Sequence, residues 1–122
     1  MKVTISSCKI IDCGNDKKTY SVHLDVNELD FKYNNIAFSD PENSCGCVNL
    51  AIIGTHVFNG NSFKNARYDE SIWKSPGING DVQTVFTSLL IQNNTFDSMY
   101  GTNQGRCFFI ISKGNNNVQI MK

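Results

Sequence analysis

The alternation of apolar and polar residues in "KTYSVHLDV", residues 18–26, most constrains the fold of this chain. The residues on one side of the extended segment are all apolar: Tyr20, Val22, Leu24 and Val26. Successive side chains of a strand point to opposite faces, so this pattern predicts a half-buried β-strand. The next segment, "LDFKY", repeats the alternation, but its apolar residues occupy odd positions instead of even ones.

This change of phase at Asn27–Glu28 has two explanations. A two-residue hairpin loop would pair Val26 with Leu29 and Leu24 with Phe31, all on one face. One long strand with a bulge would also restore the phase. We favour the hairpin.

Other segments also suggest strands joined by turns. "VTISSCKII", residues 3–11, is strand-like, and the "CGNDKK" that follows supplies turn residues. "DPENSCG" is a turn-forming stretch that leads into an apolar run, Val48 to Ile53, expected to be a buried strand. Near the other end, the apolar run at 107–111 and the short strand at 118–121 are joined by a turn rich in Gly and Asn. These two strands predict a second hairpin.

The middle of the chain is ambiguous between helix and strand. Between residues 81 and 92 the apolar residues follow helical spacing, at Val82, Val85, Phe86, Leu89 and Leu90. The same window is rich in β-branched residues, which fit a pleated sheet better. We favour a helix here, and the segment 62–73 is a weaker helical candidate.

These elements define a fold class. A chain of 122 residues is the usual size of one domain, so residues 1–122 are expected to form a single globular unit. No internal repeat is evident. The expected fold is α+β or mostly β, with an antiparallel curved sheet or small barrel built from hairpins and one possible helix near 81–92.

Charge and cysteine usage exclude several classes of protein. Eleven basic residues balance eleven acidic ones, which argues against binding to duplex nucleic acid. No apolar run reaches membrane-spanning length, so a soluble protein is expected. The five cysteines are an odd number and are expected to be reduced, as in the cytoplasm. The abundance of Asn, Lys and Ile suggests an AT-rich microbial or phage gene.

The motif Cys45-Gly46-Cys47, followed by His56, raises the question of cysteine chemistry. The chain could be a small enzyme or redox protein that uses these residues. The spacing of the thiols is poor for zinc, and ordinary roles for Cys8 and Cys107 as small core residues are more economical. We therefore expect no metal and no cofactor.

A weak anion-binding signal lies in "MYGTNQGRC", residues 99–107. Glycines let backbone N–H groups turn toward a ligand, and an arginine offers a planar fork for phosphate or carboxylate. Aromatic residues in loops or ambiguous segments, Trp73 above all, are suited to contacts with a partner. The candidate ligand-binding residues are Trp73, Tyr100, Gly101, Asn103, Gly105 and Arg106.

No catalytic set is complete, which favours binding over catalysis. The leading hypothesis is a small, soluble, non-enzymatic binding protein. It would inhibit a partner protein or sequester a small anionic ligand such as a nucleotide. The alternatives are the cysteine-dependent enzyme and a structural subunit of a homo-oligomer, in which exposed strand edges pair between copies.

Overall fold

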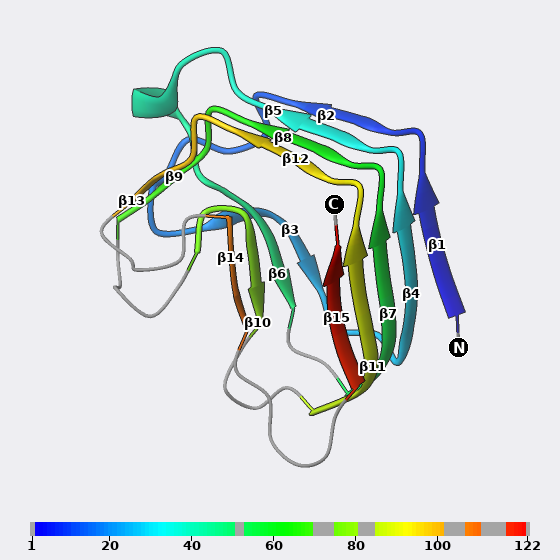
Figure 1. Ribbon diagram of the computed structural model, residues 1–122. Helices are drawn as coiled ribbons and strands as arrows, with labels where there is room; N and C mark the ends of the chain where they lie inside the picture. The colour runs from blue at the N-terminus through cyan, green and yellow to red at the C-terminus, as the bar shows by residue number, and fades with distance from the viewer. Residues whose placement is uncertain are drawn as a thin grey trace.

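A computed structural model describes residues 2–50, 53–69, 75–80, 85–101, 107–110 and 117–121. The chain winds through successive rungs that contribute strands to three larger sheets, named here A, B and C, and to one two-stranded sheet (Figure 1). Sheet A contains β1 (Lys2–Ser6), β4 (Glu28–Lys32), β7 (Ile53–Asn59), β11 (Val85–Gln92) and β15 (Asn117–Met121). Sheet B contains β2 (Lys9–Ile11), β5 (Asn35–Ala37), β8 (Ser62–Lys64) and β12 (Thr95–Asp97). Sheet C contains β3 (Tyr20–Leu24), β6 (Gly46–Leu50), β10 (Ile78–Gly80) and β14 (Phe108–Ile110).

Every strand pair among the described residues is parallel. The prediction of a β-rich chain is confirmed, but that of an antiparallel sheet or small barrel built from hairpins is wrong. Each strand pairs with its equivalent in the next rung, so Val3 lies beside Leu29 and Leu29 beside His56. Stacked rungs of this kind form a parallel β-helix.

Neither predicted hairpin is formed, because the two strands of each belong to different sheets. β3 belongs to sheet C and β4 to sheet A, so the phase change at Asn27–Glu28 marks the passage from one sheet to another. Gly54 shows how tightly this corner packs: its φ is +127°, and a Cβ there would lie 1.9 Å from the carbonyl oxygen of Asn27. β14 and β15 are likewise in different sheets.

The predicted helix near 81–92 is wrong over its described part, because residues 85–92 form β11. Leu89 and Ile91 are buried, whereas Leu90 between them is half-exposed, so the alternation has the period of a strand. In the weaker helical candidate, residues 62–64 and 67–68 are strands, β8 and β9 (Arg67–Tyr68). Residues 81–84 and 70–73 of these two candidates lie outside the described residues.

A repeat is present, although none is evident from the sequence alone. Four segments align in the structure: "KVTISSCKIID", "ELDFKYNNIAF", "THVFNGNSFKN" and "SLLIQNNTFDS". Each is a strand of sheet A, a corner and a strand of sheet B. The residue at the corner has a positive φ in all four segments, and this conformation turns the chain sharply. The corner residues are Ser7, Tyr33, Gly60 and Asn93.

An asparagine after the corner residue ties each rung to the one before. Asn61 Oδ1 accepts from the backbone N of Asn34 (2.9 Å), and its Nδ2 donates to the carbonyl of Phe31 (2.8 Å). The side chains of Asn34 and Asn94 each accept one hydrogen bond from a backbone N and donate one to a backbone carbonyl of the rung before their own. Cys8 holds this position in the first rung and is exposed, as is Cys107, so the prediction that both are core residues is wrong.

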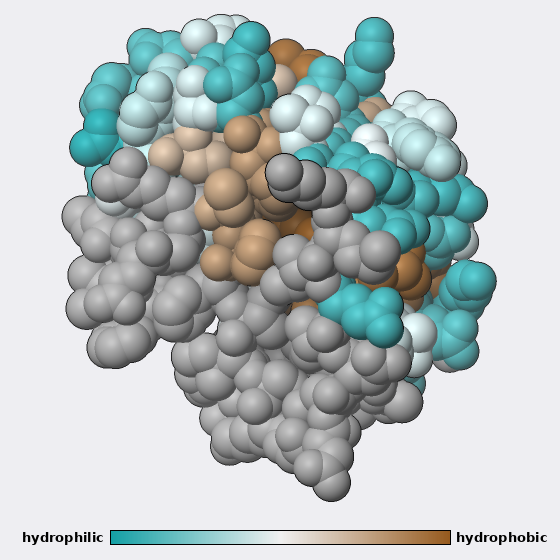
Figure 2. All heavy atoms as spheres, in the orientation of Figure 1, coloured by the Kyte–Doolittle hydropathy of each residue, from teal (hydrophilic) through white to brown (hydrophobic). Residues whose placement is uncertain are grey.

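The core is a set of side-chain stacks enclosed by the three sheets. Phe31 and Phe58 have ring centroids 5.4 Å apart, and Phe63 stacks on Phe96 at 5.0 Å. Most of the described surface drawn in Figure 2 is hydrophilic, with smaller apolar patches. The most exposed large apolar side chains are Ile11, Tyr33 and Tyr100. Within the described ranges, no helix is long and apolar enough to cross a membrane.

Candidate binding surface on the loop side

The segments that connect sheet B to sheet C lie along one side of the β-helix, which we call the loop side (Figure 1). Their described residues are 12–19, 38–45, 65–69, 75–77, 98–101 and 107. The first includes the predicted turn after β2, and the second contains a 3-10 helix, Pro41–Asn43. The last two contain the short strands β9 and β13 (Tyr100–Gly101).

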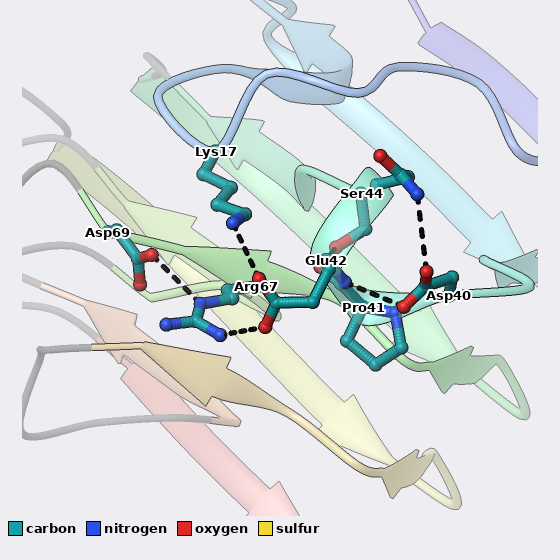
Figure 3. Close-up of polar contacts among 8 residues, drawn as sticks. Lys17, Asp40, Pro41, Glu42, Ser44, Arg67 and Asp69 are labelled. Atoms are coloured by element: carbon teal, nitrogen blue, oxygen red, sulfur yellow. Dashed lines mark hydrogen bonds and ion pairs between the residues drawn. The ribbon is translucent and has the colours of Figure 1, made fainter.

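Four charged side chains form a continuous row on the loop side (Figure 3). Lys17 Nζ lies 2.9 Å from Glu42 Oε2, and Arg67 Nη1 bonds the other oxygen of Glu42. Arg67 Nε lies 2.8 Å from Asp69 Oδ2. The signs alternate along this charge row, and its members come from three successive rungs. The row therefore connects three loops that are far apart in the sequence.

The two central members of the row, Glu42 and Arg67, have pKa values shifted by their neighbours. The hydrogen bond from Lys17, followed by the charge of Arg67, lowers the pKa of Glu42. The hydrogen bond to Asp69 and its charge raise the pKa of Arg67. Glu42 and Arg67 are therefore both ionised at neutral pH.

The turn "DPENSCG" positions Glu42, and its prediction as a turn is confirmed. Asp40 caps the 3-10 helix by accepting from the backbone N of Glu42 (3.0 Å). Pro41 suits the first helical position, where no N–H is needed. Ser44 Oγ closes the turn by donating a hydrogen bond to the carbonyl of Pro41 (2.6 Å). Local sequence thus holds the central carboxylate of the row in place.

A tyrosine pair anchors the loop that carries Arg67. The rings of Tyr20 and Tyr68 stack with centroids 4.7 Å apart, and the Tyr20 hydroxyl donates to the carbonyl of Ser75 (2.7 Å). Gly46 leaves room for Tyr20, because a Cβ at Gly46 would lie 2.4 Å from that ring. The loop is therefore held against sheet C.

The structure brings two of the six predicted ligand-binding residues to the charge row. Tyr100 pairs with Arg67, and Gly101 with Tyr68, where β13 lies beside β9. The Tyr100 side chain is exposed. The other four predicted residues lie outside the described part of the chain: Trp73, Asn103, Gly105 and Arg106.

Sequence reasoning missed a second polar row, on the outer face of sheet C. Asn79 Nδ2 donates to Asn49 Oδ1 (2.8 Å), and Asn49 Nδ2 lies 3.0 Å from His23 Nδ1. Asn79 Oδ1 in turn accepts from the backbone N of Ser75. This amide row therefore adjoins the loop side. The sequence gives no direct signal for this row, because each of the three strands contributes one member and only the register of the strands brings the members together.

Burial sets the chemistry of the predicted cysteine and histidine set. Cys45 and Cys47 are fully buried, and desolvation raises the pKa of both thiols. Desolvation also lowers the pKa of His56 to about 4. The thiols are therefore protonated at neutral pH, which disfavours a nucleophilic role. Among the described residues, no group of three or more His, Cys, Asp or Glu side chains could hold a metal ion.

The outer face of sheet A has a separate shallow hollow of about 250 Å³ next to β1. It is lined by Lys2, Glu28, Asp30, Thr55 and Val57, with Leu29. Lys32 Nζ pairs with the Asp30 carboxylate at 3.2 Å. The hollow is open and mixes charged and apolar groups, so it carries no defined chemistry.

A scan against protein-family models, a search of curated proteins and a search of solved structures give no match to this chain. Function is therefore inferred from the arrangement of the residues described above.

Proposed function

We propose that this chain is a small non-enzymatic binding protein whose loop side docks a partner protein. The observation that supports this most directly is the charge row, held in place by three rungs beside the exposed Tyr100. Arginine and tyrosine are the residue types that most often anchor protein interfaces. Side chains already ordered before binding lose less conformational entropy when a partner docks.

The charges of the row favour a protein partner over a small anion. Lys17 and Arg67 each have a carboxylate partner, so the row has no net charge. An anion such as a nucleotide would meet Glu42 and Asp69 at the same place. A partner with charges of both signs could complement the row instead. The anionic-ligand alternative depends on Arg106, which lies outside the described residues.

The proposed site of action is the cytoplasm. All five cysteines are free in the structure, and Cys8, Cys13 and Cys107 are exposed. Exposed thiols persist in a reducing compartment, whereas an oxidising one favours disulfides. Inhibition of the partner is one result that such docking could have.

The first prediction tests the loop side with proteins encoded next to this reading frame, because partners are often encoded together. Each is titrated against the wild-type chain and against Arg67→Ala and Tyr100→Ser. We expect each substitution to weaken binding about tenfold, because both remove contacts at the centre of the surface. Lys9→Ala is the matched control, since Lys9 is exposed on sheet B, and it should leave affinity unchanged.

Two results would contradict the proposal. One is a partner whose affinity is the same for wild type and both loop-side variants. The other is a thermal shift with nucleotides or other small anions in large excess, without any protein partner, because a ligand of the native state raises its stability.

A further inference from the structure

The first rung leaves one end of the core uncovered. β1, β2 and β3 are the outermost strands of their sheets, and among the described residues no strand pairs with their outer edges. The inward residues of this rung are only half-buried, whereas Leu29, Phe31, Ile36, Val48 and Leu50 of the next rung are buried. The half-buried residues are Val3, Ile5, Ile10, Val22 and Leu24.

Apart from Lys2, β1 lacks the features that normally protect an exposed edge. It contains no proline, and its register with β4 is unbroken over five residues, so no bulge twists it away. Lys2 is its only charged residue. A solenoid needs a polar cap at its end, and an unprotected edge strand is a template for another strand. Among the described residues, the outer edge of the first rung is therefore open to another strand.

The hydrogen bonds of β1 show which backbone groups face the second rung and which face the open edge, where the Ser6 carbonyl accepts from Cys8 Sγ (3.4 Å). Ser7 N donates to the carbonyl of Lys32, and the carbonyl of Ile5 accepts from Asn34, so the odd residues face the second rung. Backbone groups alternate in direction along a strand. The N–H and C=O groups of Lys2, Thr4 and Ser6 therefore point to the open edge.

We propose that β1 pairs antiparallel with β1 of a second copy of this chain, about a twofold axis at Thr4. In this register Thr4 lies opposite itself, as a pair that exchanges two backbone hydrogen bonds. Val3 lies opposite Ile5 of the second copy, and Lys2 lies opposite Ser6. Sheet A then continues through both molecules, and the two apolar ends cover each other.

We assign the partner strand to a second copy of this chain because the sequence of β1, "KVTIS", complements itself. Its pattern is the same in both directions about Thr4, so apolar positions meet apolar ones. The lysines of the two copies are not opposed, and a Thr–Thr pair is a favourable neighbour in an antiparallel sheet. A twofold contact also closes on itself, which is the commonest form of homo-oligomer. This interface is separate from the loop side and goes beyond the proposed function.

The second prediction uses the fact that a residue on a twofold axis faces its own copy. We expect wild type to sediment as a dimer that dissociates on dilution. Thr4→Lys and Thr4→Asp should each raise the dimer dissociation constant at least about tenfold, because like charges then lie directly opposite. An equimolar mixture of the two variants should restore the dimer as a heterodimer, which also shows that both variants fold.

Two further variants separate the edge from the rest of sheet A. Thr4→Pro removes an N–H that points to the open edge, so it should abolish the dimer and unfold at the midpoint that the wild type shows when diluted to a monomer. Thr55→Lys places the same new charge on an exposed residue of β7, within sheet A, and should leave the dimer intact. A wild-type monomer at all concentrations, growth beyond a dimer, or failure of the mixture to associate would each overturn the proposal.

Discussion

Single residues of this protein take their properties from the stack in which they lie. His56 occupies the position of Leu29 and Leu89 in the neighbouring rungs, and it is fully buried. In the sequence, His56 lies just beyond the apolar run Val48 to Ile53, and it is of interest mainly as a partner for the thiols. Only the register shows that it belongs to a core stack. Burial then explains its lowered pKa.

The third prediction follows from this pKa. His56 has a pKa of about 4 in the folded protein, below its ordinary value of 6.5. The unfolded chain therefore binds a proton first as the pH falls. The contribution of neutral His56 to the free energy of unfolding is therefore complete above pH 6.5. It is lost as the pH falls from 6.5 toward 4. The slope of the unfolding free energy is at most about 1.4 kcal/mol per pH unit from this residue.

Chemical unfolding of wild type and His56→Leu between pH 4 and 7 measures this effect. We expect a flatter pH dependence in the variant, since leucine suits the stack and does not titrate. Equal slopes in the two proteins would show that His56 is not the group responsible.

The elements of the fold are held in register by side chains at the corners between sheets A and B. Asn61 is buried and bonds the backbone of the second rung through both ends of its amide, and it also donates to Asn94 (2.9 Å). Asparagine is common in turns, so the residue type is no surprise. Its bonding across rungs depends on which strands are neighbours, and this is a property of the assembled coil.

The fourth prediction concerns this corner. Asn61→Ala should lower the free energy of unfolding by about 2–3 kcal/mol, because it leaves buried backbone groups of the second rung without partners. Asn35→Ala is the matched control: Asn35 is half-exposed on β5, and its loss should cost less than about 0.5 kcal/mol. Urea unfolding measures both. Similar losses in the two variants would contradict a special role for the corner asparagine.

The whole molecule is a stack in which each rung covers its neighbour, so exposure depends on the position of a residue around the coil. Cys45 and Cys47 are buried, whereas Cys8, Cys13 and Cys107 are exposed. The sequence suggested reactive chemistry at the first pair, because two thiols and a histidine are close along the chain. In the folded protein these thiols lie in the core, and the functional proposal moves to the charge row.

The fifth prediction tests this distribution of thiols. At neutral pH, alkylation should modify Cys8, Cys13 and Cys107 within minutes, whereas Cys45 and Cys47 should react only as fast as the protein opens. Mass spectrometry of timed samples identifies each site, and denaturant provides the fully reactive control. Rapid alkylation of Cys45 or Cys47 in the native protein would favour the cysteine-dependent enzyme instead.

The sequence alone determined the local structure of much of the described chain. Alternation along residues 18–26 and at Leu29 and Phe31 correctly predicted strands and their inward residues, because side-chain period is a local property. Tertiary structure decided the rest: strand direction, the three sheets, the asparagine corners and the charge row. Alternation is the same in parallel and antiparallel sheets, so it does not identify the neighbour of a strand. That neighbour lies one full rung away, where only winding of the whole chain brings it into contact.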